Sequence, residues 1–342
     1  MTLFAVLPND IDDPATPSGG NRYDRELCTG LADLGWKVRE LPAAGAWPAP
    51  APAERTALDQ LLSALPEGSS VLVDGLIASC TPTVLEAHAH RLRLIVLVHM
   101  PFGDVDQAAR PAELRALRSA AAIITTSPWS SRRLTDLYGL ASVSVTPGVA
   151  PAPPAPGSGA AGAFLCVAVV GPHKGHDVLV EALGQLTDTT WTCTLVGALD
   201  RDRAFVNALT TRISALGLTD RIRLAGPKTP ADLDAYYEST DLLIHPSRGE
   251  TYGMVAVEAL ARGIPVLATT AKGLPDAIGV AAPPGWLVPP DDPDALAEAL
   301  HRWLTNAALR QRLRAAARTR RATLTDWNVT AREVSAVLAA RN

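Results

Sequence analysis

The chain has 342 residues, of which 47% are apolar, and a formal net charge of −4 at pH 7. Its length suits two domains of roughly 150 residues each, and the apolar content is enough for each domain to bury a core. The slight acidity argues against nucleic acid as the main partner, because proteins that bind phosphate backbones are usually basic. Four cysteines show neither CxxC nor zinc-binding spacing and are expected to be reduced thiols: Cys28, Cys80, Cys166 and Cys193.

The amino-terminal segment, MTLFAVLPNDIDD, has no basic stretch and turns acidic after a few apolar residues. It is therefore not expected to be a signal peptide. No apolar run in the sequence approaches the roughly 18 residues that a membrane-spanning helix needs. We expect a cytoplasmic protein without a transmembrane segment.

Short apolar runs alternate with helical patterns through the first part of the chain. A helix is expected over 21–34, because four apolar residues there fall on one face: Tyr23, Leu27, Leu31 and Leu34. The predicted strands are nearly continuous apolar runs, as expected where helices cover both faces of a sheet. They lie at 3–8, 71–75, 92–99, 121–127 and 142–147.

Residues 149–162, VAPAPPAPGSGAAG, contain too much proline and glycine for a regular element and indicate an interdomain linker. The alternation of strands and helices then restarts. Strands are predicted at 164–171, 191–197, 221–226, 241–247 and 265–270. Helices are predicted at about 175–187, 203–216, 230–239, 252–262 and 293–305, the last with Asp292 as N-cap and Pro293 in its first turn.

This order predicts an α/β protein with two Rossmann-like, doubly wound domains whose parallel sheets face each other across a cleft. We place the first domain at 1–155 and the second at 160–325. A carboxy-terminal helix, at about 327–342, is expected to return to the first domain. In such sheets ligands bind at the carboxyl ends of the strands.

The segment GETYGMVAVEALARGIPVLAT, residues 249–269, carries two glutamates in an otherwise small and apolar run. Glu250 follows the strand at 241–247 and so lies at the ligand-binding edge. A helix is expected to start near Tyr252, and its free N–H groups suit a phosphate. Glu258 lies about two turns into that helix.

Structural explanations for the two acids remain open at this point. Glu258 and Arg262 stand four residues apart and suit a surface ion pair, and Glu250 suits a helix cap. Because burying an unpaired carboxylate is costly, the two acids are expected either to pair within the protein or to bind a ligand.

Residues 245–278, HPSRGETYGMVAVEALARGIPVLATTAKGLPDAI, resemble the signature of family 4 glycosyltransferases, retaining enzymes with the GT-B fold. The family pattern has two glutamates separated by seven residues, then Gly-x-Pro-Val and a later Gly before Pro and an acid. The corresponding positions here are Glu250, Glu258, Gly263–Val266, Gly273 and Asp276, where the family has Glu in place of Asp. Segments 18–41, 173–183 and 285–300 resemble further family elements, in order and at the right spacing.

The resemblance implies roles in binding a nucleotide-diphosphate sugar. Glu258 would accept hydrogen bonds from the ribose hydroxyls, and Glu250 would contact the donor sugar near its C3. A carboxylate only accepts hydrogen bonds, so it suits a diol and repels phosphate. Backbone amides would line the sugar and the diphosphate at Thr251, Tyr252, Gly253, Met254 and Val255.

By the same resemblance, Lys174 would stabilise the charge that grows on the leaving diphosphate. Gly19 and Gly20, expected just before the first helix, would bring amides near the same phosphates. A solvated loop lysine and a plain turn are the structural alternatives. Many relatives also carry an arginine five residues before this lysine, where the chain has Val169.

We hypothesise that Arg248 or His173 replaces this missing cation. His99, at the end of the strand over 92–99, would lie beside the donor sugar, and Asp74 is a weaker candidate. A hydrogen-bonded structural histidine is the alternative reading of His99.

The triplets DVD (104–106) and DRD (200–202) resemble a metal-binding motif of another glycosyltransferase class. Such triplets are common by chance, and GT-B enzymes generally need no divalent ion, so neither a metal nor another cofactor is expected. The arginine-rich helix over 309–321 is read as a solvated face, and peripheral membrane contact is not favoured.

The sequence thus predicts a retaining glycosyltransferase that moves a sugar from a nucleotide-diphosphate sugar, with UDP favoured over GDP, to an acceptor hydroxyl. Catalysis is assigned to Glu250, Lys174 and His99. The alternatives are a GT-B nucleotide-sugar epimerase and a non-catalytic nucleotide-sugar binding protein. Acceptor specificity is expected in first-domain loops around 9–20, 76–85 and 100–110, but the sequence names neither the acceptor nor the oligomeric state.

Overall fold

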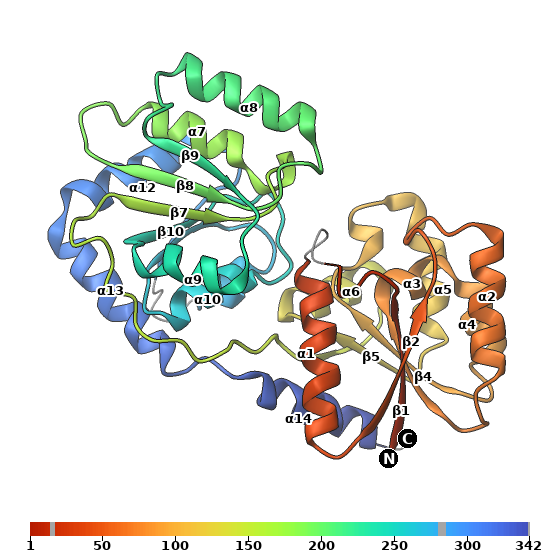
Figure 1. Ribbon diagram of the computed structural model, residues 1–342. Helices are drawn as coiled ribbons and strands as arrows, with labels where there is room; N and C mark the ends of the chain where they lie inside the picture. The colour runs from red at the N-terminus through yellow and green to blue at the C-terminus, as the bar shows by residue number, and fades with distance from the viewer. Residues whose placement is uncertain (14–17, 280–284, 341–342) are drawn as a thin grey trace. The chain divides into compact units, whose positions relative to one another are not determined.

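The structure is a computed structural model that describes residues 1–13, 18–279 and 285–340. The chain divides into two compact units, one formed by Met1–Gly148 with Thr325–Asn342 and the other by Val149–Leu324. Each unit contains a six-stranded parallel sheet, drawn as arrows in Figure 1. The two predicted parallel sheets are therefore confirmed. The first unit ends at Gly148, whereas the sequence interpretation extended it to residue 155.

The sheet of the first unit has the strand order β2-β1-β3-β4-β5-β6. Its strands are β1 (Thr2–Pro8), β2 (Lys37–Ala43), β3 (Ser70–Asp74), β4 (Arg93–Val98), β5 (Ala122–Thr125) and β6 (Val143–Ser144). Its helices are α1 (Gly19–Asp33), α2 (Pro52–Ser63), α3 (Gly75–Cys80), α4 (Pro82–His88), α5 (Arg110–Arg118), α6 (Pro128–Tyr138) and α14 (Trp327–Ala339), with short 3₁₀ turns at Phe102–Asp104 and Gln107–Ala109.

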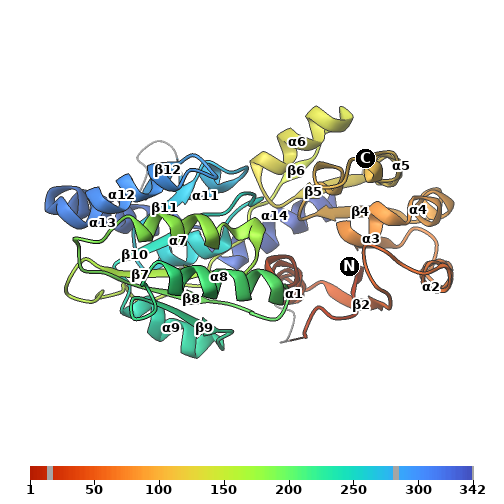
Figure 2. The same ribbon diagram turned by 90° about the horizontal axis from the view of Figure 1, so that it is seen from above.

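Alternate strand residues of the first sheet enter two different cores. Val71 and Val73 of β3 pack with the apolar residues of α2–α6, whereas Leu72 packs with α1 and α14. In Figure 2, α2–α5 accordingly lie together on one side of this sheet, and Figure 1 shows α1 beside α14. The apolar strands are thus covered on both faces, as their continuous hydrophobic runs predict.

The second sheet has the strand order β12-β11-β10-β7-β8-β9. Its strands are β7 (Ala163–Val167), β8 (Thr192–Val196), β9 (Ile222–Gly226), β10 (Leu242–His245), β11 (Val266–Thr269) and β12 (Gly285–Val288). Its helices are α7 (His176–Gly184), α8 (Arg203–Ala215), α9 (Pro230–Glu238), α10 (Met254–Ala261), α11 (Leu274–Ile278), α12 (Pro293–Thr305) and α13 (Ala307–Arg321), with a 3₁₀ turn at Pro172–Lys174.

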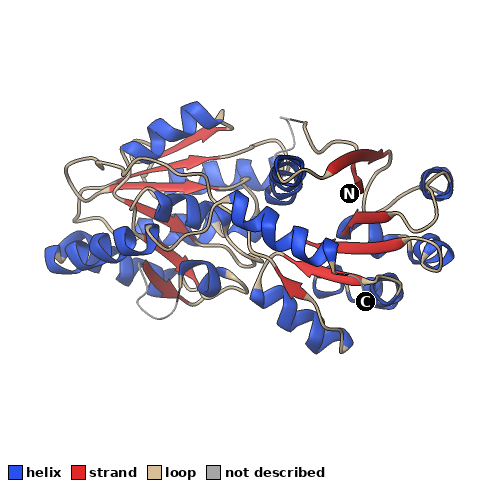
Figure 3. Cartoon of the chain, turned by 90° about the horizontal axis from the view of Figure 1, so that it is seen from below, coloured by secondary structure: helices blue, strands red, loops and turns tan. Residues whose placement is uncertain are grey.

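This second sheet is also buried between two layers of helices, which Figure 3 shows in blue on both sides of the red strands. Helices α7, α8 and α12 form one core with the sheet, and α9, α10, α11 and α13 contribute to the other. The start of α12 is as predicted: Asp292 accepts a hydrogen bond from the amide of Ala295, and Pro293 is the first helical residue.

The sequence interpretation missed β2 and β12. Both lie at the edge of their sheets, and β2 is largely exposed along the run KVRELPA. A strand with one free edge need not be apolar throughout, so the continuous-run criterion fails for β2. Strand β12 is apolar but short, with the four residues GWLV. Residues 18–41, read as a loop and helix, therefore contain both α1 and most of β2. The expected strand at 142–147 is shorter than predicted and spans only Val143–Ser144.

The predicted linker crosses from one unit to the other without a helix or a strand between β6 and β7. The carboxy-terminal helix α14 belongs to the first unit, where it packs against α1. Close approach fixes Gly148, since a Cβ there would lie 2.3 Å from the backbone nitrogen of Trp327. The Thr330 hydroxyl also donates a hydrogen bond to the carbonyl of Thr146.

Candidate functional site

In the second unit, polar residues gather where β7, β10 and β11 end. These three strands are neighbours in the sheet, so their carboxyl ends meet at one edge, where ligands of such folds bind. The loop after β10 carries Glu250, and the turn after β7 carries Lys174. The structure therefore brings together the two residues that the sequence assigned to catalysis in this part of the chain.

Lys174 and Glu250 form an ion pair, with Lys174 Nζ 2.7 Å from Glu250 Oε2. His245, the last residue of β10, is buried and places its Nε2 3.5 Å from the same oxygen. Burial by itself raises the pKa of Glu250, but His245 and Lys174 outweigh it and lower that pKa to about 2. Glu250 is therefore held as a carboxylate, and both side chains stay about 20% exposed to a ligand.

Helix α10 begins at Met254, two residues later than the sequence indicated. Gly253 precedes it with a φ of 105°, a conformation that favours glycine. Space is also limited there, because a Cβ on Gly253 would lie 2.5 Å from Leu274 Cδ2. Thr251 and Tyr252 thus belong to the loop, while the amides of Met254 and Val255 open the helix. Such first-turn amides have no partner within their helix and suit an anion.

Glu258 lies on α10 and is about 9% exposed. Its Oε2 accepts a hydrogen bond of 3.1 Å from the Tyr237 hydroxyl. Arg262 donates to the backbone carbonyl of Glu258 and pairs with Asp234, while its guanidinium stacks over the Tyr237 ring. These Arg262 contacts differ from the simple surface ion pair that the spacing of four residues suggested. The expected ribose contact of Glu258 stays a prediction.

Arg248 does not suit the role of the missing cation. Its guanidinium makes a bidentate pair with Asp177, with both N–O distances 2.8 Å, and its Nε lies 2.5 Å from Asp291. Two carboxylates thus already neutralise this side chain. His173 is also a weak candidate, because burial and the nearby Lys174 charge lower its pKa and favour the neutral ring.

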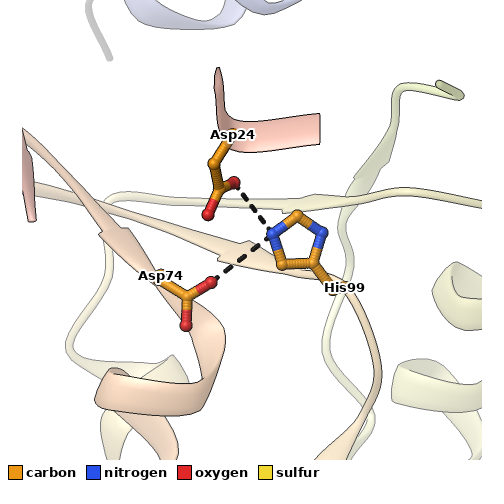
Figure 4. A group of neighbouring side chains, drawn as sticks. All are labelled: Asp24, Asp74 and His99. Atoms are coloured by element: carbon orange, nitrogen blue, oxygen red, sulfur yellow. Dashed lines mark hydrogen bonds and ion pairs between the residues drawn. The ribbon is translucent and has the colours of Figure 1, made fainter. Parts of the chain in front are cut away.

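The first unit contains a second polar cluster, shown in Figure 4. His99, just past the end of β4, places its Nε2 2.8 Å from Asp24 Oδ1 and 3.4 Å from Asp74 Oδ2. Asp24 comes from α1, and Asp74 ends β3 and caps α3 through the amide of Leu76. The other ring nitrogen of His99 points away from both aspartates, and the side chain is about 22% exposed.

The charges in this cluster depend on one another. Burial lowers the pKa of His99, but the Asp24 and Asp74 carboxylates more than compensate and raise it to about 10. Burial raises the pKa of Asp24, although His99 opposes that shift. At neutral pH we therefore describe His99 as an imidazolium held by two buried carboxylates.

The start of α1 contacts this cluster. Ser18 caps the helix by accepting from the amide of Asn21, so Gly19 and Gly20 occupy its first turn instead of preceding it. A Cβ on Gly20 would lie 3.3 Å from the His99 ring, and this close approach explains the glycine. The predicted glycines and the predicted histidine thus belong to one site within the first unit.

Comparison with known proteins identifies the second unit. The family described as "Glycosyl transferases group 1" matches residues 160–320. These residues are a group 1 glycosyltransferase domain.

Curated relatives agree with this assignment. The chain is 32% identical over 248 residues to a D-inositol 3-phosphate glycosyltransferase of Kineococcus radiotolerans, an alignment that covers 64% of this chain and 57% of the relative. It is 34% identical over 171 residues to one of Jonesia denitrificans, covering 48% of this chain and 40% of the relative. The matched parts thus span about half the length of these relatives.

Solved structures establish that the fold is GT-B. Sucrose-phosphate synthase from Thermosynechococcus elongatus matches with a TM-score of 0.82 at 22% identity, over 98% of both chains. Anabaena HepE in complex with UDP and glucose matches with a TM-score of 0.79 at 18% identity, over 100% of both chains. At these identities the likeness supports the fold of this chain and neither its activity nor its substrate.

The acidic triplets of this chain have structural contacts. Asp104 pairs with Arg133 at 2.6 Å, and Asp106 accepts from the amide of Ala108. Asp202 caps α8 by accepting from the amide of Phe205. Within the described residues, the group with suitable geometry to hold a metal ion is Asp24, Asp74 and His99. The expectation of no metal requirement stays a prediction, and chelation tests it.

Several arginines of helix α13 contact other parts of the second unit, whereas the sequence interpretation read this helix as a solvated face. Arg310 donates to the carbonyls of Trp303 and Leu304, Arg314 pairs with Asp241, and Arg321 donates to the carbonyl of Ala261. These contacts fasten α13 to its own unit. Within the described chain no helix combines the length and the apolarity needed to cross a membrane.

Of the loops expected to select the acceptor, 100–110 is anchored by a buried acid. Glu113 accepts from the amides of Phe102 and Gly103, both at 2.7 Å, and from the hydroxyls of Ser79 and Tyr138. Four donors therefore satisfy this fully buried carboxylate and fix the segment that follows His99. Part of the expected loop 9–20, residues 14–17, lies outside the described residues.

Sequence reasoning missed Asp24 and His245. Asp24 follows Tyr23 on the buried side of α1, and a charged residue beside an apolar stripe was the available signal. His245 stands at the end of a buried strand, in the same kind of position as His99. Its burial and its distance to Glu250 are decided by the tertiary structure.

Proposed function

We propose that this chain is a retaining glycosyltransferase that moves a sugar from a UDP-sugar to an acceptor hydroxyl. The observation that carries the proposal is the Lys174–Glu250 pair beside the first turn of α10, at the ligand-binding edge of a group 1 glycosyltransferase domain. A lysine, a constrained glycine and free helix amides suit a diphosphate, and a fixed carboxylate suits sugar hydroxyls.

The chemistry that we assign to these residues is mainly electrostatic. The bond between the sugar C1 and the diphosphate oxygen breaks, and a bond from C1 to the acceptor oxygen forms on the same face. The acceptor proton passes to an oxygen of the leaving diphosphate, so no protein base is required. Lys174 and the amides that open α10 stabilise the charge that develops on this leaving group.

Glu250 has two roles in this proposal. Its carboxylate orients the donor sugar by accepting hydrogen bonds from the hydroxyls near C3, and it also positions Lys174 at 2.7 Å. The low pKa of Glu250 keeps it an acceptor throughout the pH range in which the enzyme would work. The contact of His99 with the donor sugar, which the sequence resemblance implies, stays a prediction.

The choice of donor and acceptor rests on the relatives. Structures of Anabaena HepE hold UDP, UDP with glucose, and UDP-glucose, and this likeness favours a UDP-linked donor for this chain. The names of the curated relatives make D-inositol 3-phosphate the first acceptor to test. The acceptor is otherwise left open.

The test is a turnover assay with purified protein and a panel of UDP- and GDP-sugars, with D-inositol 3-phosphate and simple sugars as acceptors. We expect acceptor-dependent release of UDP, and a product whose anomeric configuration by NMR equals that of the donor. An inverted product contradicts the retaining assignment. Isomerised sugar from donor alone indicates an epimerase, and calorimetric donor binding without turnover on the whole acceptor panel indicates a binding protein.

A further inference from the structure

His245 is a buried histidine at the end of strand β10 whose ring makes no hydrogen bond. The residue is about 3% exposed, and neither ring nitrogen has a hydrogen-bond partner among the described residues. Most buried polar side-chain atoms in proteins are hydrogen-bonded, because burying such an atom without a partner is unfavourable. An exception beside charged residues at a ligand-binding edge therefore calls for a physical reason.

The ring of His245 faces the acid of the candidate site. Its Nε2 lies 3.5 Å from Glu250 Oε2, which is longer than an ordinary hydrogen bond and short enough for a small side-chain rotation to form one. The same carboxylate oxygen contacts Lys174 Nζ at the shorter distance of 2.7 Å. Glu250 therefore has one partner in contact and a second partner nearby whose hydrogen bond is not yet made.

The backbones that carry these side chains are fixed to one another. Gly175, next to Lys174, has a φ of 70°, and a Cβ there would lie 2.0 Å from the carbonyl oxygen of Pro246. The Gly273 amide donates a 2.8 Å hydrogen bond to the carbonyl of Glu250. The side chains of Lys174 and Glu250 are each about 20% exposed. Rearrangement at this edge is therefore expected in the side chains and not in the backbone.

A bound diphosphate changes the balance between the two partners of Glu250. The phosphates of a nucleoside diphosphate carry several negative charges, which attract the Lys174 ammonium. The carboxylate of Glu250 then loses its cation, and a largely buried carboxylate without a partner is unfavourable. His176, buried near His245, does not supply a replacement charge, because burial lowers its pKa to about 4 and favours the neutral ring.

We propose that His245 is a positioning residue that holds Glu250 in place when the diphosphate of the donor draws Lys174 away. This inference rests on the proposed function and deepens it. With a proton on Nε2, His245 donates a hydrogen bond to Glu250 Oε2 and leaves the other carboxylate oxygen for the sugar hydroxyls. Lys174 is then free to serve the leaving group. The exchange alters hydrogen bonds alone, and no proton is transferred.

The test is a double-mutant cycle in which calorimetry measures the binding of UDP and GDP to purified protein. His245→Asn removes the donor at the Nε2 position, because the asparagine amide is too short to reach it, and His245→Gln restores a donor there. We expect His245→Asn to bind the preferred diphosphate about tenfold more weakly, the size of one hydrogen bond to a charged group, and His245→Gln to bind it nearly as the wild type does. In Glu250→Gln, which has no charge to hold, adding His245→Asn should change the affinity little.

Two controls separate this role from packing. Uridine has no phosphate to attract Lys174, so its binding by saturation-transfer NMR should be equal in His245→Asn and the wild type. His88→Asn removes a buried histidine of the first unit that lies 2.9 Å from Asp59, and it should bind the diphosphate as the wild type does. His245→Leu, which fills the space without a donor, provides the same cycle where the asparagine variant does not fold.

The outcomes separate the two proposals. Wild-type affinity for the diphosphate in His245→Asn overturns the role of His245, while turnover by the wild-type protein leaves the proposed function in place. Equal losses of affinity with and without Glu250→Gln show that His245 acts through packing and also overturn the role, as does a loss in His245→Gln as large as that in His245→Asn. A wild-type protein that binds neither UDP nor GDP overturns both this inference and the proposed function.

Discussion

The two polar clusters of this protein use similar residues in different electrostatic states. Each joins an acid to a cation near the carboxyl edge of a parallel sheet. In the second unit the pKa of Glu250 falls to about 2, because Lys174 and His245 outweigh its burial. In the first unit burial dominates at Asp24 and raises its pKa, and the cation there is a histidine.

This difference indicates different tasks. The pKa of Glu250 is lowered to about 2, so this acid keeps its charge at neutral pH. The charge of His99 exists only because two carboxylates hold it. The first cluster is therefore expected to respond to pH above neutrality and to the loss of one acid, whereas the second is expected to respond to pH only on the acid side.

The largest effect is expected for Lys174→Ala. Loss of the cation should lower kcat by about a hundredfold to a thousandfold, the usual size of one preorganised charge-stabilising donor. Steady-state kinetics with varied donor measures it. Glu250→Gln is the matched control, since it disrupts the ion pair and leaves the lysine. Equal kcat in Lys174→Ala and the wild type contradicts a role for Lys174 in charge stabilisation.

A smaller effect is expected for Asp24→Asn. This change removes the carboxylate nearest to His99 and should lower the pKa of the imidazolium. The alkaline limb of kcat/KM should then move to lower pH, with kcat/KM near pH 8 reduced about tenfold. NMR titration of the His99 ring provides an independent measurement. Asp74→Asn should shift the same limb less, because Asp74 Oδ2 lies 3.4 Å from His99 Nε2, whereas Asp24 Oδ1 lies 2.8 Å from it. An unmoved limb in both variants shows that His99 is not the titrating group.

The free energy of unfolding is expected to depend on pH in opposite directions for the two clusters. The pKa of Glu250 is lowered from 4.5, so its stabilisation is present above pH 4.5 and lost as the pH falls toward 2. The pKa of His99 is raised from 6.5, so its stabilisation is present below pH 6.5 and lost as the pH rises toward 10.

Urea unfolding across pH measures these contributions. In Glu250→Gln, the free energy of unfolding should change less with pH on the acid side than in the wild type. In His99→Asn, it should change less with pH between pH 6.5 and 9. Each difference should be of order 1 kcal/mol or more. The comparison ends at pH 9 because burial raises the pKa of the Cys28 and Cys166 thiols, and unfolded thiols ionise above that pH. Parallel profiles for the wild type and His99→Asn contradict the charged state assigned to His99.

The smallest effect is expected from chelation. EDTA should leave kcat unchanged, because Lys174 and the α10 amides neutralise the diphosphate in the proposed mechanism. Activity that EDTA abolishes and magnesium, manganese or zinc restores contradicts this expectation. Such a result directs attention to Asp24, Asp74 and His99, and Asp24→Asn should then weaken metal binding as well as move the pH profile.

The local sequence was sufficient to predict most of the buried strands and helices. Apolar runs predicted ten strands, and all ten coincide with strands of the described chain, although β6 is much shorter than expected. The edge strand β2 was missed because one free edge relaxes the demand for apolar residues, and β12 was missed because its apolar run, GWLV, is only four residues long. The start of α10 was misplaced by two residues, since the conformation of Gly253 depends on its packing against Leu274.

The sequence alone determined the two α/β units, the family resemblance and the positions of Glu250, Lys174 and His99, because periodicity and motif spacing are local properties of the chain. The tertiary structure decided which charges meet. Asp24 reaches His99 across 75 residues, and Lys174 reaches Glu250 across 76. Burial and pairing between residues far apart in the chain set their pKa values, and strand order, which brings such residues together, is a property of the folded sheet.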